Sequence, residues 1–308
     1  MRRQHPWLLL SVLAVAGTLL TTTAAPRVLA RTPAEQAKGK TRDIFLSVTD
    51  KAGAPATGLT INDFTVREDN QSREVLAAAA ATMPMRIVLL IDNSQATQSL
   101  ANEMRIAMAG FINAIFKASP DSTMALMTFG DRPTPVQEFT SAAPILARAA
   151  QRIFPITGAG AYMTDAVADA AKMLRRDPAT RQVIVAFIDE SGEEFSNTGR
   201  QEALDALRQS NAALWIVALQ SAATSMTSSE ARDRSALIDE GASGTGGTTL
   251  PLLNRLSLPP KMLELAGLLT HQIQVTYGRP DQMIPPKKLD VQLTRKDLKM
   301  QAPRWAGQ

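Results

Sequence analysis

The apolar positions of this chain predict a core in which buried strands alternate with amphipathic helices. Short apolar runs rich in branched side chains cannot span a membrane, and they are typical of strands buried on both faces of a parallel sheet. Four such runs occur, at Ile87–Ile91, Thr123–Phe129, Val183–Ile188 and Ala212–Leu219. Between them, apolar residues recur at helical spacing, most clearly from Leu100 to Ile115. This alternation predicts an α/β domain with a doubly wound, mostly parallel sheet.

Both ends of the chain instead alternate apolar and polar residues with the period of a half-buried strand. On the N-terminal side we expect strands at Asp43–Asp50 and Phe64–Glu68, a returning strand at Glu74–Leu76, and a linker at Ala77–Pro84. On the C-terminal side we expect strands at Gln272–Tyr277, Leu289–Thr294 and Leu298–Ala302, the last two forming a hairpin with Asp297 at its tip.

Neither end has enough apolar residues to hold a core alone, so we expect the two ends to share one. The predicted architecture is an α/β domain inserted in a small β domain that both termini form. The expected bounds are 31–84 for the N-terminal linker and β segment, 85–271 for the α/β domain, and 272–308 for the C-terminal β segment.

The first 30 residues have the features of a secretory signal peptide. Arg2 and Arg3 precede the apolar run Trp7–Leu20, and small residues lead up to Ala30. We expect cleavage near Ala30 and an extracytoplasmic mature protein, periplasmic or secreted. The alternative is an uncleaved leader, and only in that case would the chain be anchored in a membrane.

Charge and residue counts exclude several classes of function. The formal net charge is +4, but removal of the leader with its three arginines leaves 30 basic and 29 acidic residues, which does not indicate nucleic-acid binding. The chain has no cysteine, so disulfides and thiolate chemistry are excluded. Only His271 follows the leader, which disfavours Ser-His-Asp triads and most zinc sites.

Two predicted strands end in carboxylates that can form a cation site. Asp92 and Ser94 follow the first buried run, and Asp189 follows the third. Carboxyl ends of parallel strands meet at one sheet edge, where such folds bind ligands. Carboxylates and hydroxyls are the hard oxygen ligands that Mg²⁺ or Ca²⁺ prefers. The alternative is a vestigial site whose aspartates cap helices and accept hydrogen bonds from loop amides.

Two further polar segments are weaker candidates. Glu190, Glu193 and Glu194 follow Asp189 and could add ligands, although such a cluster is more typical of a solvated loop. The segment Gly241–Thr248 resembles a phosphate-binding loop with Gly247 in place of the lysine. It lacks a strand directly before it, so we expect no nucleotide and interpret it as a loop that needs glycine conformations.

The chain resembles a family of secreted bacterial proteins in which a von Willebrand factor A domain follows a short β segment. VTDKAGAPATGLTINDFTVREDN followed by IVLLIDNSQ carries the first half of the resemblance. QIQVTYGRP and LDVQLTRKDLKMQAPRW are similar to the family's closing strands. The resemblance covers roughly Asp43 to Trp305, and it implies a Rossmann-like sheet with a metal-ion-dependent adhesion site on its upper edge.

The resemblance also implies the residues of that site. In such domains a D-x-S-x-S loop, a threonine from a second loop and a later aspartate surround Mg²⁺, and an acidic residue of a partner often completes the shell. Asp92, Ser94 and Asp189 match three of these positions. Ala96 replaces the second serine and Ala161, in GAGAYMTDAV, replaces the threonine, so the site is degenerate and Mg²⁺ binding weak or absent. The hydroxyls of Thr97 and Thr164 are near in sequence, but neither is in register.

These observations favour an exported, non-enzymatic module that binds a protein partner, with no nucleic-acid or nucleotide ligand. Two alternatives stay open. One is a metal-dependent hydrolase that uses water held between Asp92 and Asp189, although no other general base is evident there. The other is a scaffold with a vestigial metal site, on which cations have no effect.

Overall fold

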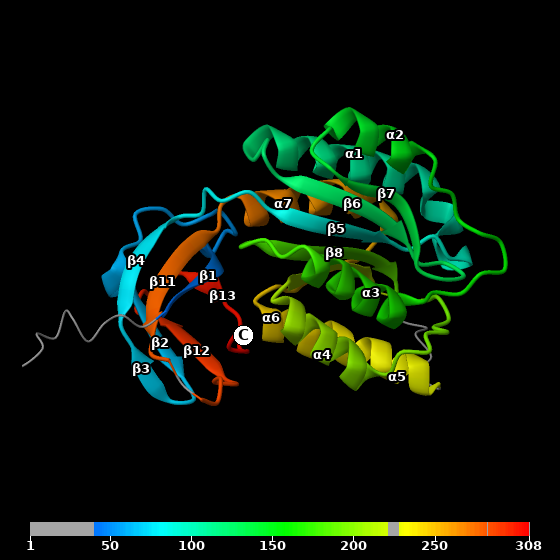
Figure 1. Cartoon of the computed structure of the whole chain (residues 1–308). Helices are drawn as coiled ribbons and strands as arrows, with labels where there is room; N and C mark the ends of the chain where they lie inside the picture. Colours follow the sequence, from blue (N-terminus) through cyan, green and yellow to red (C-terminus); the bar gives the residue numbers. More distant parts are fainter. Residues whose placement is uncertain (1–39, 221–227, 282, 308) are drawn as a thin grey trace, which may run out of the picture. The chain divides into compact units, whose positions relative to one another are not determined.

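A computed structural model describes residues 40–220, 228–281 and 283–307, which form three β-sheets and the helices that cover one of them (Figure 1). The predicted leader and most of the Ser/Thr-rich segment after the fourth apolar run lie outside the described residues. Within the described part of the chain, no helix is long and apolar enough to cross a membrane.

The six-stranded sheet has the strand order β10-β9-β8-β5-β6-β7. All neighbours pair in parallel except β7, which is an antiparallel edge strand. Every residue of β8 is buried, as expected for a strand covered on both faces. The strands are β5 (Arg86–Ile91), β6 (Thr123–Thr128), β7 (Thr134–Thr140), β8 (Gln182–Asp189), β9 (Ala213–Leu219) and β10 (Thr249–Leu252).

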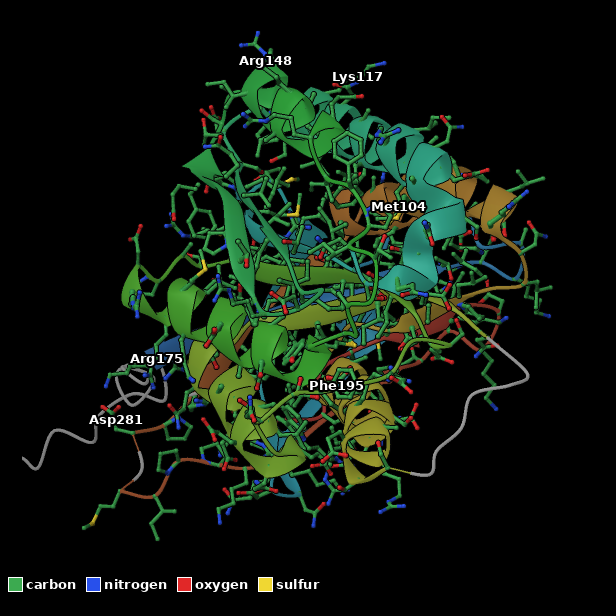
Figure 2. The ribbon with its side chains drawn as sticks, turned by 90° about the vertical axis from the view of Figure 1, so that its right-hand side faces the viewer. Met104, Lys117, Arg148, Arg175, Phe195 and Asp281 are labelled. Atoms are coloured by element: carbon green, nitrogen blue, oxygen red, sulfur yellow. The ribbon has the colours of Figure 1, made fainter. Side chains whose placement is uncertain are left out.

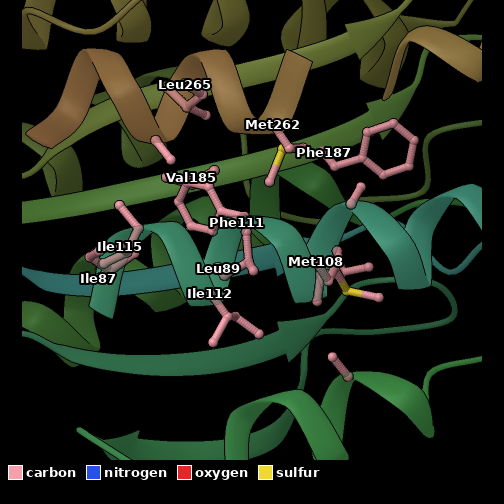
Figure 3. Close-up of a cluster of buried hydrophobic side chains, with 14 of the residues drawn as sticks. Ile87, Leu89, Met108, Phe111, Ile112, Ile115, Val185, Phe187, Met262 and Leu265 are labelled. Carbon is pink, nitrogen blue, oxygen red and sulfur yellow. The ribbon is translucent and has the colours of Figure 1, made fainter. Parts of the chain in front are cut away.

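Helices cover both faces of this sheet because its central strands are apolar on both sides. Ile87 and Leu89 of β5 pack in one core, while Val88 and Leu90 pack in the other. The first core receives α1 (Ala101–Ala118), α2 (Ala143–Gln151) and α7 (Leu258–Thr270), and Figure 3 shows part of it. The second receives α3 (Met163–Arg176), α4 (Arg200–Ser210) and α6 (Ala242–Thr245), and α5 (Ser229–Ala236) runs into α6 through a π-helical turn at Leu237–Gly241.

The glycine-rich segment differs from the predicted turn because helix α6 occupies most of it. The helix ends at Gly246, whose φ of +85° is the left-handed conformation that glycine adopts without strain. Gly247 follows where the chain runs close against β9, and a Cβ at this position would lie 1.9 Å from the carbonyl oxygen of Leu214. Close packing therefore accounts for these glycines without a phosphate ligand.

The remaining strands form two sheets, with orders β13-β1-β11-β4 and β12-β2-β3. They combine both ends of the chain, since Ile44 of β1 pairs with Val275 of β11 and Val66 of β2 pairs with Val291 of β12. One apolar core lies between the two sheets. The strands are β1 (Lys40–Thr49), β2 (Phe64–Glu68), β3 (Gln71–Arg73), β4 (Val75–Ala80), β11 (Ile273–Arg279), β12 (Leu289–Leu293) and β13 (Lys299–Gln301).

The fold class predicted from the sequence is confirmed: a mostly parallel α/β sheet is inserted in a small β unit that both termini form. The division of the chain at residues 84/85 and 271/272 stays a prediction. Short 3₁₀ turns at Ile61–Asp63, Gln95–Leu100 and Arg255–Ser257 complete the described elements.

Two details of the terminal strands were predicted wrongly. The last two strands do not form a hairpin, because β12 pairs with β2 and β13 pairs with β1. The expected linker begins with a strand, β4, which pairs with β11. The hairpin partner of β2 is β3, which starts directly after Asp69 and Asn70, both at positive φ. The alanine run of β4 has no apolar-polar alternation, so the sequence pattern could not indicate a strand there.

A buried carboxylate crosslinks the β unit. Glu68 is fully buried and accepts hydrogen bonds from the Tyr277 hydroxyl at 2.7 Å, from Arg279 Nε at 2.7 Å and from Arg73 Nε at 2.9 Å. The Glu68 carboxylate therefore forms ion pairs with two guanidinium groups, that of Arg73 on β3 and that of Arg279 on β11.

The C-terminal tail packs against α6 through an aromatic ring. The amides of Arg304 and Trp305 both donate to the Gly244 carbonyl, at 2.9 Å and 3.0 Å. A Cβ at Gly244 would lie 2.2 Å from the Trp305 ring. The absence of a side chain at this position is therefore what allows the ring to sit against the helix.

We expect Gly244→Ala to lower the free energy of unfolding by about 1–3 kcal/mol, because the new methyl group and the Trp305 ring cannot occupy the same space. The matched control is Gly267→Ala in α7, where no atom lies within 4 Å of the added Cβ. That change should stabilise the protein by up to about 1 kcal/mol, since alanine favours the helix. Denaturant unfolding measures both, and equal values for the two variants would contradict the placement of Trp305.

Candidate functional site

Three loops converge at the carboxyl edge of the six-stranded sheet. They follow β5, α2 and β8, and main-chain hydrogen bonds join them. The amide of Ile156 donates to the Asn93 carbonyl at 2.8 Å, and the amide of Gln95 donates to the Ala159 carbonyl at 2.9 Å. The amide of Ala161 donates to the Glu193 carbonyl at 2.7 Å. The loops therefore form one connected surface.

Asp92 lies at the centre of this edge, directly after the last apolar residue of β5. Its side chain is 0% exposed. One carboxylate oxygen accepts the amide of Ser94 at 2.9 Å, and the other accepts the amide of Asp189 at 3.0 Å. Burial raises the pKa of Asp92 above its ordinary value, against the lowering effect of these hydrogen bonds.

The structure brings Ser94 and Asp189 to the same edge. Ser94 is fully buried, and its hydroxyl has no hydrogen-bond partner among the described residues. Asp189 is 5% exposed, and one of its carboxylate oxygens accepts from the amide of Ser191 at 3.0 Å and from its hydroxyl at 2.6 Å. A Cβ at Gly192 would lie 3.4 Å from the Ser94 hydroxyl, so the loop after β8 passes directly over that serine.

The two alanines sit where the neighbouring loops meet. Ala96 faces Gly192, where an added Cβ would lie 3.2 Å from that of Ala96. Ala161 is fully buried, and its carbonyl accepts the amide of Phe195 at 2.8 Å. The Thr97 hydroxyl donates to the Ser94 carbonyl at 2.9 Å, which is a local turn contact. The Thr164 hydroxyl is buried and has no hydrogen-bond partner in the part of the chain that the structure describes.

Glu194 is a buried part of this edge that the sequence pattern did not single out. The interpretation of the acidic cluster as a solvated loop fits exposed Glu193 but is wrong for Glu194, which is only 3% exposed. One oxygen of Glu194 accepts from the Ser196 hydroxyl at 2.5 Å and from the Thr164 amide at 3.3 Å. Burial raises the pKa of Glu194 to about 7, although Arg234 nearby opposes the shift.

Arg234 of α5 fixes the same loop from the other side. It is buried and donates to the carbonyls of Gly192 at 2.8 Å and Glu190 at 3.0 Å. Its guanidinium lies 3.7 Å from Glu194. Arg234 is one of four charged residues in the polar helix SEARDRSA, so no sequence signal distinguishes it from the others.

Asn93 is a second residue that the sequence reasoning missed. Its side-chain oxygen accepts the amide of Gly130 at 2.7 Å, which ties the end of β6 to the loop after β5. A Cβ at Gly130 would lie 2.7 Å from the Asn93 main chain, so only glycine fits this approach. Nothing in the sequence marked the pair beyond the position of each at a strand end.

The donor set at this edge fits a hard cation with an incomplete protein shell. Among the described residues, no group of three or more histidine, cysteine, aspartate or glutamate side chains is placed to hold a metal. Two carboxylates and one hydroxyl are present, and the unpartnered hydroxyl of Ser94 beside a desolvated Asp92 is the environment that a cation would satisfy.

Exposed apolar side chains lie on the loops at this edge of the sheet. Phe154 and Ile156 follow α2, and Phe195, labelled in Figure 2, follows β8 with 48% of its surface exposed. Leu253, 89% exposed, and Leu256, 70% exposed, follow β10 at the same edge. We call these five residues the apolar rim. Exposed apolar side chains that form one contiguous patch are characteristic of interaction surfaces, whereas single ones are common on any protein surface.

Comparisons with known proteins found one family model and several solved structures that are similar to this chain. Residues 87–193 match the family model of the von Willebrand factor type A domain, and no curated protein matches the chain. A von Willebrand factor type A structure from Catenulispora acidiphila is 11% identical, covering 88% of this chain and 75% of its own, with a TM-score of 0.49. Proximal thread matrix protein 1 from the mussel byssus, whose structure has a zinc-occupied metal-ion-dependent adhesion site, is 15% identical, covering 66% and 49%, with a TM-score of 0.50.

A third similar structure is the domain of the type V pili tip protein from Porphyromonas gingivalis, 12% identical, covering 62% of this chain and 96% of its own, with a TM-score of 0.46. Likeness at these identities concerns the fold alone. The family match spans β5 to the loop after β8 and includes Asp92, Ser94, Ala161 and Asp189. With the parallel sheet and its covering helices, it shows that the α/β part of this chain is a von Willebrand factor type A domain.

Proposed function

We propose that this protein is an exported, non-enzymatic interaction module that docks a protein partner on the carboxyl edge of its six-stranded sheet. The observation that carries the proposal is the apolar rim, which lies at the same sheet edge as three loops that main-chain and buried polar contacts fix. Fixed loops lose little conformational entropy on binding, and exposed apolar side chains gain from burial in an interface. Export rests on the leader sequence alone.

We propose further that Asp92, Ser94 and Asp189 would hold Mg²⁺ weakly. A bound cation would supply positive charge beside two carboxylates and could accept an acidic ligand from the partner. The Asp92 carboxylate is desolvated and the Ser94 hydroxyl is fully buried beside it, so both groups gain from a cation. The zinc-occupied site of the mussel protein supports the idea that this fold can hold a metal at such a motif.

A scaffold with a vestigial site is the competing proposal, and one observation favours it. Both oxygens of Asp92 and one of Asp189 already accept hydrogen bonds from the loops, so the protein satisfies part of the site without a metal. A hydrolase is less well supported, because both oxygens of Asp92 already accept loop amides, which weakens this carboxylate as a general base.

Restoring the two hydroxyls tests the metal proposal. We expect Ala96→Ser with Ala161→Thr to strengthen Mg²⁺ binding, since each oxygen ligand contributes on the order of 1 kcal/mol, or roughly fivefold in affinity. Calorimetric titration with Mg²⁺ measures the change. The matched control is Ala96→Ser with Ala161→Val, because valine has the shape of threonine without the hydroxyl. No heat from any of the three proteins would favour the vestigial site.

The raised pKa of Glu194 predicts a pH dependence of stability. The folded state binds this proton more tightly than the unfolded state, whose pKa is near the ordinary 4.5. The contribution of Glu194 is therefore greatest below pH 4.5 and is lost as the pH rises through about 7. We expect the unfolding free energy of Glu194→Gln, relative to the parent, to rise by about 2 kcal/mol between pH 5 and pH 8. Glu193→Gln is the exposed control, and a difference for Glu194→Gln that does not change with pH would contradict the buried placement.

Site-specific crosslinking tests the docking proposal itself. A photoreactive phenylalanine analogue at Phe195 should capture a defined partner in the envelope of the native host. The same analogue at Asp121, an exposed residue before the amino end of β6, should not. A second change in the rim, Leu253→Asp, should reduce the capture by placing a charge in the apolar contact. Capture that a chelator abolishes would indicate a bridging cation, and equal capture from both positions would refute the docking surface.

A further inference from the structure

A cavity of about 380 Å³ lies at the opposite, amino edge of the six-stranded sheet, between the α/β domain and the terminal β unit. Its walls come from β1, from the segment 178–183 that leads into β8, from the end of α4 and the start of β9, and from the C-terminal tail around Trp305. The volume is within the range of small-molecule sites in proteins.

The lining of this cavity is strongly basic. Four arginines, Arg42, Arg181, Arg208 and Arg279, face one carboxylate, Asp43. Two of the arginines have carboxylate partners outside the lining. Arg208 pairs with Asp205 at 2.7 Å, and Arg279 pairs with Glu68, which also serves Arg73.

Arg181 is a buried charge without a carboxylate partner among the described residues. It is 3% exposed, and it donates to neutral groups: the Met83 carbonyl at 3.2 Å, the Leu269 carbonyl, and the side-chain oxygen of Gln272 at 2.9 Å. Its Nε has no hydrogen-bond partner. Burial lowers the pKa of Arg181 to about 10, the sign of a desolvated charge that nothing opposite compensates.

Arg42 is the second arginine without a counter-charge in the described chain. Its Nε is buried and makes no hydrogen bond within the described residues, and the side chain as a whole is half-buried. The residue sits on β1 opposite Tyr277 of β11. The other side of β1 is open here, because β13 pairs only with Ser47–Thr49. The cavity therefore runs along an unpaired strand edge that carries Arg42.

We propose that this cavity binds the oxyanion group, carboxylate or phosphate, of a small organic ligand, which the half-buried guanidinium of Arg42 recognises beside the buried charge of Arg181. A guanidinium presents its donors in a fixed plane that matches the oxygens of either group. Pro178, Pro303 and Trp305 provide apolar wall for the remainder of the ligand. The site is separate from the docking edge, so it stands whether or not the proposed function is correct.

Calorimetry and NMR of the arginine Nε–H resonances test this proposal with the whole purified protein. The probes are succinate and glycerol 3-phosphate, matched with the uncharged succinamide and glycerol. We expect at least one anionic probe to bind saturably and to shift the Nε–H signals of Arg42 and Arg181, while the uncharged probes do neither. Which anion binds more tightly distinguishes a carboxylate site from a phosphate site.

A pair of variants separates a built site from general attraction of anions to a basic surface. Arg42→Gln should weaken binding about tenfold or more, since it removes a charged hydrogen bond without removing any existing contact. Arg67→Gln, at an exposed arginine of β2, should leave the affinity unchanged. Three results would overturn the proposal: no saturable binding by either anion, an unchanged affinity of Arg42→Gln, or an equal loss in both variants.

Discussion

The burial of β5 and β8 on both faces is the constraint on which the rest of the structure depends. A strand with no side toward water cannot hold an unpartnered polar side chain in its middle, so its first acidic residue comes where the strand ends. Asp92 and Asp189 occupy these ends, at one sheet edge, and both still lie in a desolvated position. Their carboxylates accept loop amides, which in turn fix the course of the loops. The course of the loops and the burial of the carboxylates thus both follow from the burial of β5 and β8 on both faces.

The insertion of the α/β domain in the β unit places a second demand on the chain. The chain must pass into the α/β domain and out of it at neighbouring points. Arg181 lies at both points, since it donates hydrogen bonds to the carbonyl of Met83 before β5 and to the carbonyl of Leu269 at the end of α7. Main-chain carbonyls can orient a guanidinium but do not neutralise it. The junction therefore fixes the position of the Arg181 guanidinium but leaves its positive charge without a neighbouring negative charge among the described residues.

Much of this architecture is predictable from the sequence, because the apolar runs and the alternation of the terminal strands follow from burial alone. Asp92, Ser94 and Asp189 were placed correctly at one edge by the same logic, since parallel strands share it. The partners of β12 and β13 were not predictable from the sequence. Two strands close in sequence usually form a hairpin, but here β12 pairs with β2, more than 200 residues away. Arg234 was missed, and the burial of Glu194 was not expected, because a buried charged pair has no periodicity to reveal it.

The two edges of the sheet carry buried charges of opposite sign. At the carboxyl edge, Asp92 is desolvated beside an unpartnered serine hydroxyl, which suits a cation. At the amino edge, Arg181 is desolvated and Arg42 lies half-buried beside the same cavity, which suits an anion. A fold could remove either cost with apolar residues of similar volume, and such replacements are often stabilising. This chain keeps a buried carboxylate at one edge of the sheet and a buried guanidinium at the other, where loops or an open strand leave room for a ligand. This is the physical reason to look for two ligands of opposite charge.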